Sequence, residues 1–300
     1  MFPNASDRTA SAVLFVAAAF WGLYWWPLRY LEGLGFGATW SVAFFNALPV
    51  LVTAPYVALR WREQGRALRA TALIGLFMGV GLGCYASGLV MSSVIRATML
   101  FYLTPIWSTL IGVLWLGERL TAGRIIAIAA GLGGLWLLLS GAEGSSVPLN
   151  IGDAFSLIAG VLWGVGAALI KKHPDAPTTL ASVWQFLFAC LFCVGASMVL
   201  FAEAPPALGA LIAGLPVALA GSILVLLPSL YAIFWASKRL FPGRVGILMM
   251  SEAIVAILSA SLLLPDEMLS LRQWFGSAVI LAACLVEVLT KDEGMASQAA

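Results

Sequence analysis

Glu252 is the residue of this sequence best placed to do chemistry, because it is the one carboxylic acid well inside a long apolar segment. A charged side chain is costly in hydrocarbon, so an acid at this depth is a hypothesis for a functional site. It could bind an ammonium group, carry a proton, or pair with an arginine, and Arg244 precedes it by eight residues. A structural polar contact between helices is the competing interpretation.

Two tryptophans lie unusually deep in apolar segments. Trp21 is about ten residues into its segment, near the centre of a bilayer, whereas tryptophans usually collect at the interface. Trp163 is equally deep. On a helix, Trp21 shares one face with Tyr24, Trp25 and Leu28, which follow it at helical spacing. The two tryptophan rings either line one cavity or serve as packing or lipid-facing bulk.

Three tyrosines, Tyr85, Tyr102 and Tyr231, also lie within apolar segments. A phenol in hydrocarbon needs a hydrogen-bond partner. Around a cavity, the hydroxyls would hold the polar end of a ligand while the rings contact its apolar body. Hydrogen bonding between helices is an equally compatible interpretation.

Pro105 and Pro228 are candidate hinges. A proline inside a helix removes the hydrogen bond to the carbonyl four residues earlier, which is Phe101 for Pro105, and bends the helix. Gly117-Glu118-Arg119 then ends the first of these helices, and we expect it to return the chain to water.

No arrangement of residues indicates an enzyme or a metal site. His173 is the only histidine, and there is no HExxH motif. Cys190 and Cys193 have metal-ligand spacing, but they lie in an apolar segment without a second Cys or His pair, so we interpret them as packing residues. No basic run with aromatic residues suggests nucleic acid. We expect no catalytic group, cofactor, metal or nucleic-acid partner.

The composition predicts an all-α polytopic membrane protein. Of the 300 residues, 62% are hydrophobic and only 10% are charged, against about 25% charged residues in soluble domains. A span needs about 20 apolar residues. The apolar runs predict ten spans: Ser11–Leu28, Ala38–Leu59, Ala70–Met91, Val94–Leu116, Ala122–Leu139, Gly152–Ile170, Thr178–Phe201, Leu211–Ala236, Val245–Leu264 and Leu271–Leu289.

The distribution of positive charge predicts the orientation, because cytoplasmic loops are rich in Lys and Arg. With both termini inside, 13 of the 16 Lys and Arg residues fall on the cytoplasmic side. The three exceptions are Arg29, Arg96 and Arg272.

Short matches recur in order along the two halves of the chain. Phe20-Trp21-Gly22 matches Leu162-Trp163-Gly164, Tyr85-Ala86 matches Tyr231-Ala232, and Gly117-Glu118 matches Asp266-Glu267, with offsets of 142, 146 and 149 residues. They predict two five-helix repeats, over residues 11–140 and 151–290. Since five is odd, the second repeat is inserted upside down, as in many secondary transporters.

Gly75, Gly79 and Gly83 recur every four residues in the third span. This spacing predicts that the backbone of a neighbouring helix approaches closely along one face, and it would permit sliding between conformations.

The sequence resembles the EamA-type families of the drug/metabolite transporter superfamily over nearly the whole chain, Ser11 to Leu289. The resemblance rests on the ten spans in two inverted halves, the two Trp-Gly matches, and Tyr102-Leu103-Thr104-Pro105 followed by residues 116–121. Within the superfamily, the Tyr-Leu-x-Pro sequence and the two deep tryptophans are similar to those of aromatic amino-acid exporters.

The resemblance implies a bacterial-type inner-membrane exporter. Its central cavity is lined by spans one, three, four, six, eight and nine, with spans five and ten peripheral and with Trp21, Tyr102 and Trp163 as cavity residues. The sequence departs from the pattern at Ile254, where a proline is common, and at Asp266-Glu267, where Gly-Glu is common.

The residues and the resemblance together predict alternating-access export of a small-molecule substrate across the bilayer. We expect aromatic or neutral amino acids, or related amphipathic metabolites. Lipophilic cations or drugs are the alternative substrates. A non-transporting scaffold or sensor is the alternative of another class, against which the inverted repeat argues.

Overall fold

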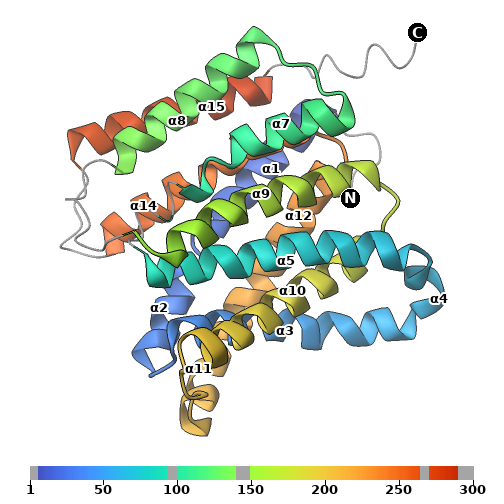
Figure 1. Ribbon diagram of the computed structural model, residues 1–300, viewed down its shortest axis with the longest axis vertical. Coiled ribbons are helices and arrows are strands. Elements are labelled where there is room, and N and C mark those ends of the chain that lie inside the picture. The colour runs from blue at the N-terminus through green and yellow to red at the C-terminus, as the bar shows by residue number, and fades with distance from the viewer. Residues whose placement is uncertain (1–5, 93–96, 98–99, 140–148, 264–269, 290–300) are drawn as a thin grey trace.

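In the computed structural model the described residues, 6–92, 97, 100–139, 149–263 and 270–289, form helices and no strand (Figure 1). Two π-helical segments, η2 (Ala196–Leu200) and η3 (Gly221–Leu226), and one 3-10 turn, η1 (Gly65–Ala67), join or extend helices. In chain order the α-helices are α1 Asp7–Trp21, α2 Trp25–Gly33, α3 Ala38–Leu59, α4 Trp61–Gln64, α5 Leu68–Met91, α7 Thr104–Leu116, α8 Ala122–Leu139, α9 Ile151–Lys172, α10 Thr178–Gly195, α11 Leu208–Ala220, α12 Leu227–Ser237, α13 Pro242–Met249, α14 Ser251–Leu263 and α15 Leu271–Leu289.

Within the described residues, six helical stretches are long and apolar enough to cross a membrane. They are Asp7–Gly33, Thr39–Leu59, Leu68–Gly88, Ile151–Lys172, Thr178–Leu200 and Leu208–Ser237. Shorter apolar helices cover Thr104–Leu116 and Ala122–Leu137. The predicted second, fifth and tenth spans have the same bounds as α3, α8 and α15, while the total of ten crossings stays a prediction.

Three of the predicted spans are interrupted rather than continuous. The first breaks into α1 and α2 at residues 22–24, and the ninth breaks into α13 and α14 at Met250. In the fourth, residues 102–103 form a turn directly before α7. In a membrane such breaks are tolerated only where other groups satisfy the freed backbone atoms.

Each predicted hinge proline lies directly after an irregularity in its span, the turn at residues 102–103 for Pro105 and η3 for Pro228, and their role as hinges stays a prediction. Pro105 is in the first turn of α7, where a proline costs no intrahelical hydrogen bond. The carbonyl of Phe101 accepts a hydrogen bond from the Thr104 hydroxyl. Pro228 is the second residue of α12 and follows η3 directly, so a wide π-helical turn accommodates it.

The glycine stripe of α5 packs against α10, as its spacing predicts. A Cβ added at Gly79 would lie 3.0 Å from the backbone nitrogen of Ala189 and 3.0 Å from the Cβ of Phe188. Gly75 lies against Trp184 and Gly83 against Phe192 in the same way. The other side of α5 packs against α9, so this helix is held between two neighbours.

The bundle has two edges and a buried centre. Figure 1 shows α8 and α15 side by side at one edge, the peripheral position that the resemblance implies for spans five and ten. Helices α3 and α10 pack together at the opposite edge. Between the edges, all eight residues of α13 are buried, against α7, α1 and α9.

Candidate functional site

Five aromatic rings from four predicted spans interlock at the centre of the bundle. The rings of Trp21 and Trp163 meet edge to face, with centroids 6.1 Å apart and an interplanar angle of 80°. Phe101 meets Trp163 at 6.4 Å and Tyr102 at 5.2 Å, also edge to face. Tyr85 stacks on Phe101 at 4.2 Å. We call these five residues the aromatic cluster.

Two residues of the aromatic cluster lie at breaks in the helices. Trp21 is the last residue of α1, and Tyr102 begins the turn before α7. Helix α9 packs closely against residues 101–104, since a Cβ added at Gly160 would lie 2.9 Å from the Phe101 carbonyl oxygen. Sequence reasoning missed the ring of Phe101 and used only its carbonyl. Its position directly before Tyr102, a predicted site residue, could have indicated that the Phe101 ring lies in the same site.

The glycine after each deep tryptophan lets an interrupted helix approach. A Cβ at Gly22 would collide with the backbone of α14 at Glu252 and Ala256. A Cβ at Gly164 would lie 3.1 Å from the hydroxyl of Ser108 on α7. Each Trp-Gly pair therefore places a ring in the cluster and gives a close helix contact beside it.

The cluster is closed in this conformation. The exposed fractions of Trp21, Tyr102 and Trp163 are 4%, 2% and 3%. The predicted pair of cavity-lining rings lies in mutual contact, so these rings fill the space between themselves. A ligand could reach them only after the surrounding helices move apart.

Glu252 lies beside the cluster, in the first turn of α14. It is 8% exposed, and its carboxyl group interacts with the Tyr102 hydroxyl, which forms no hydrogen bond of ordinary geometry. The neighbouring Ser251 hydroxyl donates a hydrogen bond of 2.9 Å to the Phe15 carbonyl of α1. The helix that carries the carboxyl group is therefore tied to α1.

Within the described part of the chain, no Lys or Arg forms an ion pair with Glu252. Arg244 is fully buried, but its Nε donates a 2.9 Å hydrogen bond to the Ser11 hydroxyl near the start of α1. The third alternative for Glu252, pairing with an arginine, is not seen there.

Tyr231 is the predicted site residue that the structure places apart from the cluster. It lies on α12 and interacts with Thr179, at the start of α10, and with Tyr56, near the end of α3. The structure thus brings together Trp21, Tyr85, Tyr102, Trp163 and Glu252.

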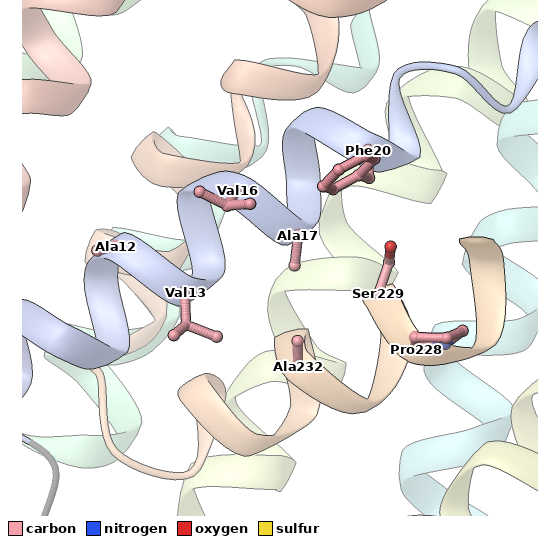
Figure 2. Close-up of a pocket in the computed structure, with 8 residues that line it drawn as sticks. All are labelled: Ala12, Val13, Val16, Ala17, Phe20, Pro228, Ser229 and Ala232. Atoms are coloured by element: carbon pink, nitrogen blue, oxygen red, sulfur yellow. The ribbon is translucent and has the colours of Figure 1, made fainter. Parts of the chain in front are cut away.

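Pro228 lines an open apolar groove between α1 and α12, shown in Figure 2. The groove has a volume of about 410 Å³ and contains no charged side chain. Its wall on α1 includes Val16 and Phe20, which are 51% and 53% exposed. The lining residues are Ala12, Val13, Val16, Ala17, Phe20, Pro228, Ser229 and Ala232, none of which belongs to the aromatic cluster.

The predicted return to water at Gly117-Glu118-Arg119 fails for the Glu118 side chain, which is buried, whereas Gly117 and Arg119 are exposed. Gly117 ends α7 in the left-handed conformation, with φ 69°, and Glu118 then folds back against Gly112. Its carboxylate pairs with Arg124 and accepts a 3.3 Å hydrogen bond from the backbone N–H of Gly243, in the first turn of α13. A carboxylate is favoured at a helix N-terminus.

Lysines close the same end of the bundle. Lys171 donates a hydrogen bond to the Arg239 carbonyl, and Lys238 donates one of 2.7 Å to the Ala176 carbonyl. Burial lowers the pKa of the Lys238 ammonium, an effect opposed by Asp175 and reinforced by Arg239. Together with Glu118 and Arg124, these groups tie residues 238–243, at the start of α13, to the ends of α7, α8 and α9, and we call this the basic end.

Comparison with known proteins identifies the family. An "Uncharacterized transporter" of Archaeoglobus fulgidus is 26% identical over 165 residues, which are 55% of this chain and 57% of the relative's own length. A solved crystal structure that is 18% identical superposes with a TM-score of 0.73 over 95% of this chain and 99% of its own, so the two share a fold. The EamA-like transporter family matches residues 8–140 and 150–289, nearly the whole sequence. The chain belongs to the EamA-like transporter family.

Proposed function

We propose that this transporter exports amino acids, aromatic and neutral ones above all, or related amphipathic metabolites, across the inner membrane. Membership of the EamA-like transporter family indicates that the protein carries a small-molecule substrate across a lipid bilayer. The substrate class rests on one observation, the aromatic cluster with Glu252 beside it at the meeting point of three interrupted helices. Interrupted helices are where secondary transporters form their binding sites.

The chemistry of the site fits the two parts of such a substrate. The faces and edges of the Trp21, Phe101 and Trp163 rings offer contact to an apolar or aromatic side chain. The Glu252 carboxylate offers a counter-charge to an ammonium group, and the Tyr102 hydroxyl offers a hydrogen bond. The spacing of these groups after opening decides which amino acids fit.

Transport by alternating access needs two halves that move relative to each other, and the packing supports two inverted repeats. The contact between α9 and α5 has its counterpart between α1 and α12. The contact between α7 and α9 has its counterpart between α13–α14 and α1. The helices α8 and α15 pair with each other, as do α3 and α10. With the basic end in the cytoplasm, both termini are cytoplasmic.

A lipophilic-cation or drug exporter is the second candidate. A buried carboxyl group beside aromatic rings also suits a cation that carries its own apolar surface. The two candidate functions differ only in the substrate, since the transport path and the closing movement would be the same.

Counterflow in proteoliposomes separates the candidates. Vesicles loaded with unlabelled L-phenylalanine should accumulate labelled L-phenylalanine, and unlabelled L-tryptophan or L-leucine should compete with it. Tetraphenylphosphonium serves as the cation probe. Accumulation of the cation without any amino-acid counterflow would favour the second candidate, and accumulation of neither would contradict both.

We expect Trp163→Ala to weaken L-phenylalanine transport about tenfold, because the loss of one close aromatic contact costs on the order of 1.4 kcal/mol. The readout is the initial rate of counterflow as a function of phenylalanine concentration. The matched control is Trp136→Ala, since Trp136 lies on the peripheral helix α8 and is 55% exposed. Equal kinetics in the two variants would remove Trp163 from the site.

A further inference from the structure

We propose that Glu252 makes this protein an obligatory exchanger, whose closed conformation forms only when the carboxylate holds a proton or the ammonium group of a substrate. The inference rests on the proposed function and specifies how its site is coupled. It follows from the burial of Glu252, from its neighbours, and from its attachment to the helix breaks.

Closing the helices over an ionised Glu252 without a bound cation is energetically unfavourable. In the closed conformation Glu252 is 8% exposed and interacts with Tyr102 of the aromatic cluster. An isolated carboxylate transferred from water to an apolar environment loses many kcal/mol of solvation unless a partner compensates. An ionised, empty Glu252 therefore opposes closure, whereas a neutral carboxylic acid or a carboxylate–ammonium pair permits it.

Among the residues that the structure describes, no group in contact with Glu252 supplies the missing positive charge. The turn before α7 contributes the Tyr102 hydroxyl, with Tyr85 behind it. Helix α1 contributes the backbone at Gly22 and the Phe15 carbonyl that binds Ser251. Arg244, on the preceding half-helix α13, is engaged with Ser11 instead. The Tyr102, Tyr85, Gly22 and Phe15 groups are neutral, so the neutralising charge comes from the substrate or from water.

The charge of Glu252 is linked to movement of the interrupted helices through close backbone contacts. The backbone of its first helical turn packs directly against Gly22, at the break in the first span. Pro105, at the start of α7, lies against Gly246 of α13, just before the break in the ninth span. Any separation of these breaks that admits water to the cluster also exposes Glu252. Opening and ionisation are therefore coupled.

The proposed cycle exchanges one substrate for one proton. On the inside, substrate with its ammonium group replaces one proton on Glu252, and the proton enters the cytoplasm. On the outside, one proton replaces the substrate, and the protonated carboxyl group returns. Each cycle exports one substrate and imports one proton, so both a pH gradient and an interior-negative potential drive the export of a zwitterion.

The test uses proteoliposomes that contain the pH-sensitive dye pyranine, with L-phenylalanine as the probe. A phenylalanine gradient should drive protons in the opposite direction in the wild-type protein, and Glu252→Gln should reduce this movement at least tenfold. Glu252→Asp, which keeps the carboxyl group, should retain proton movement at a lower rate. Glu32→Gln is the matched control, because Glu32 is half-buried and pairs with the exposed Arg29 outside the cluster, and it should behave as the wild type does.

A second measurement needs no substrate. Acid should favour the closed conformation. In the wild type, acrylamide quenching of tryptophan fluorescence should therefore decrease as the pH is lowered. In Glu252→Gln it should stay low at every pH, because the amide cannot ionise. If phenylalanine counterflow is absent, the proposed substrate class fails, and the quenching experiment decides the coupling. If counterflow is present but drives no protons, the exchange is overturned while the proposed function stands. Proton movement at the wild-type rate in Glu252→Gln would also overturn it.

Discussion

Gly79→Val is expected to prevent accumulation of folded protein. A Cβ at this position would meet the backbone nitrogen of Ala189 and the Cβ of Phe188 at 3.0 Å, and the Gln185 carbonyl even more closely. Backbone atoms cannot move aside as a flexible side chain can, so α5 and α10 would have to separate. Since overpacking a tight contact costs about 1–3 kcal/mol and occasionally more, we expect a loss of at least about 3 kcal/mol.

The measurement is the yield of monodisperse protein after detergent extraction, followed by thermal unfolding of what remains. Gly133→Val is the matched control, because Gly133 lies within α8 and a Cβ there has no neighbour within 4 Å. We expect the control to change stability by no more than about 0.5 kcal/mol. A well-folded Gly79→Val protein would show that the two helices are not held at this distance.

Glu118→Ala is expected to destabilise the closed basic end by about 3 kcal/mol, because removing one partner of a buried ion pair leaves the other charge desolvated. The Glu118 and Arg124 side chains are only 3% and 10% exposed. The substitution also removes the carboxylate that accepts the Gly243 N–H at the start of α13. We expect a lower thermal midpoint and faster proteolysis between α7 and α8.

The matched control is Glu63→Ala, which removes an ion pair with Arg60 whose side chains are 55% and 66% exposed. Exposed pairs contribute about 0–1 kcal/mol, so this variant should unfold nearly as the wild type does. Equal stability of the two variants would show that Glu118 is solvated and that the basic end is held by other contacts.

The sequence was most informative where depth and spacing alone decide the outcome. Trp21 and Trp163 lie far from the ends of their segments, and the structure brings their rings together. The spacing of Gly75, Gly79 and Gly83 identified the face of α5 that a neighbouring backbone approaches, because only glycine leaves that space. The bounds of α3, α8 and α15 followed from uninterrupted apolar runs.

The sequence was least informative about breaks and about polar groups satisfied by distant residues. Residues 22–24 leave the helix ahead of Pro27, but the contact that holds this turn comes from α14, more than 200 residues later. Glu118 looked solvent-exposed because its partners, Arg124 and the Gly243 N–H, are set by tertiary packing. Tyr231 shares a motif with Tyr85, but its neighbours are Thr179 and Tyr56.

The central claim, that the aromatic cluster is the substrate site, is tested most directly by photoaffinity labelling. The probe is 4-azido-L-phenylalanine, activated on the purified protein in lipid, with the modified peptides located by mass spectrometry. We expect adducts on residues 101–102, Trp21 or Trp163 that excess L-phenylalanine suppresses. Adducts confined to the groove beside Phe20 or to exposed residues such as Trp136, or labelling that L-phenylalanine does not suppress, would contradict the claim.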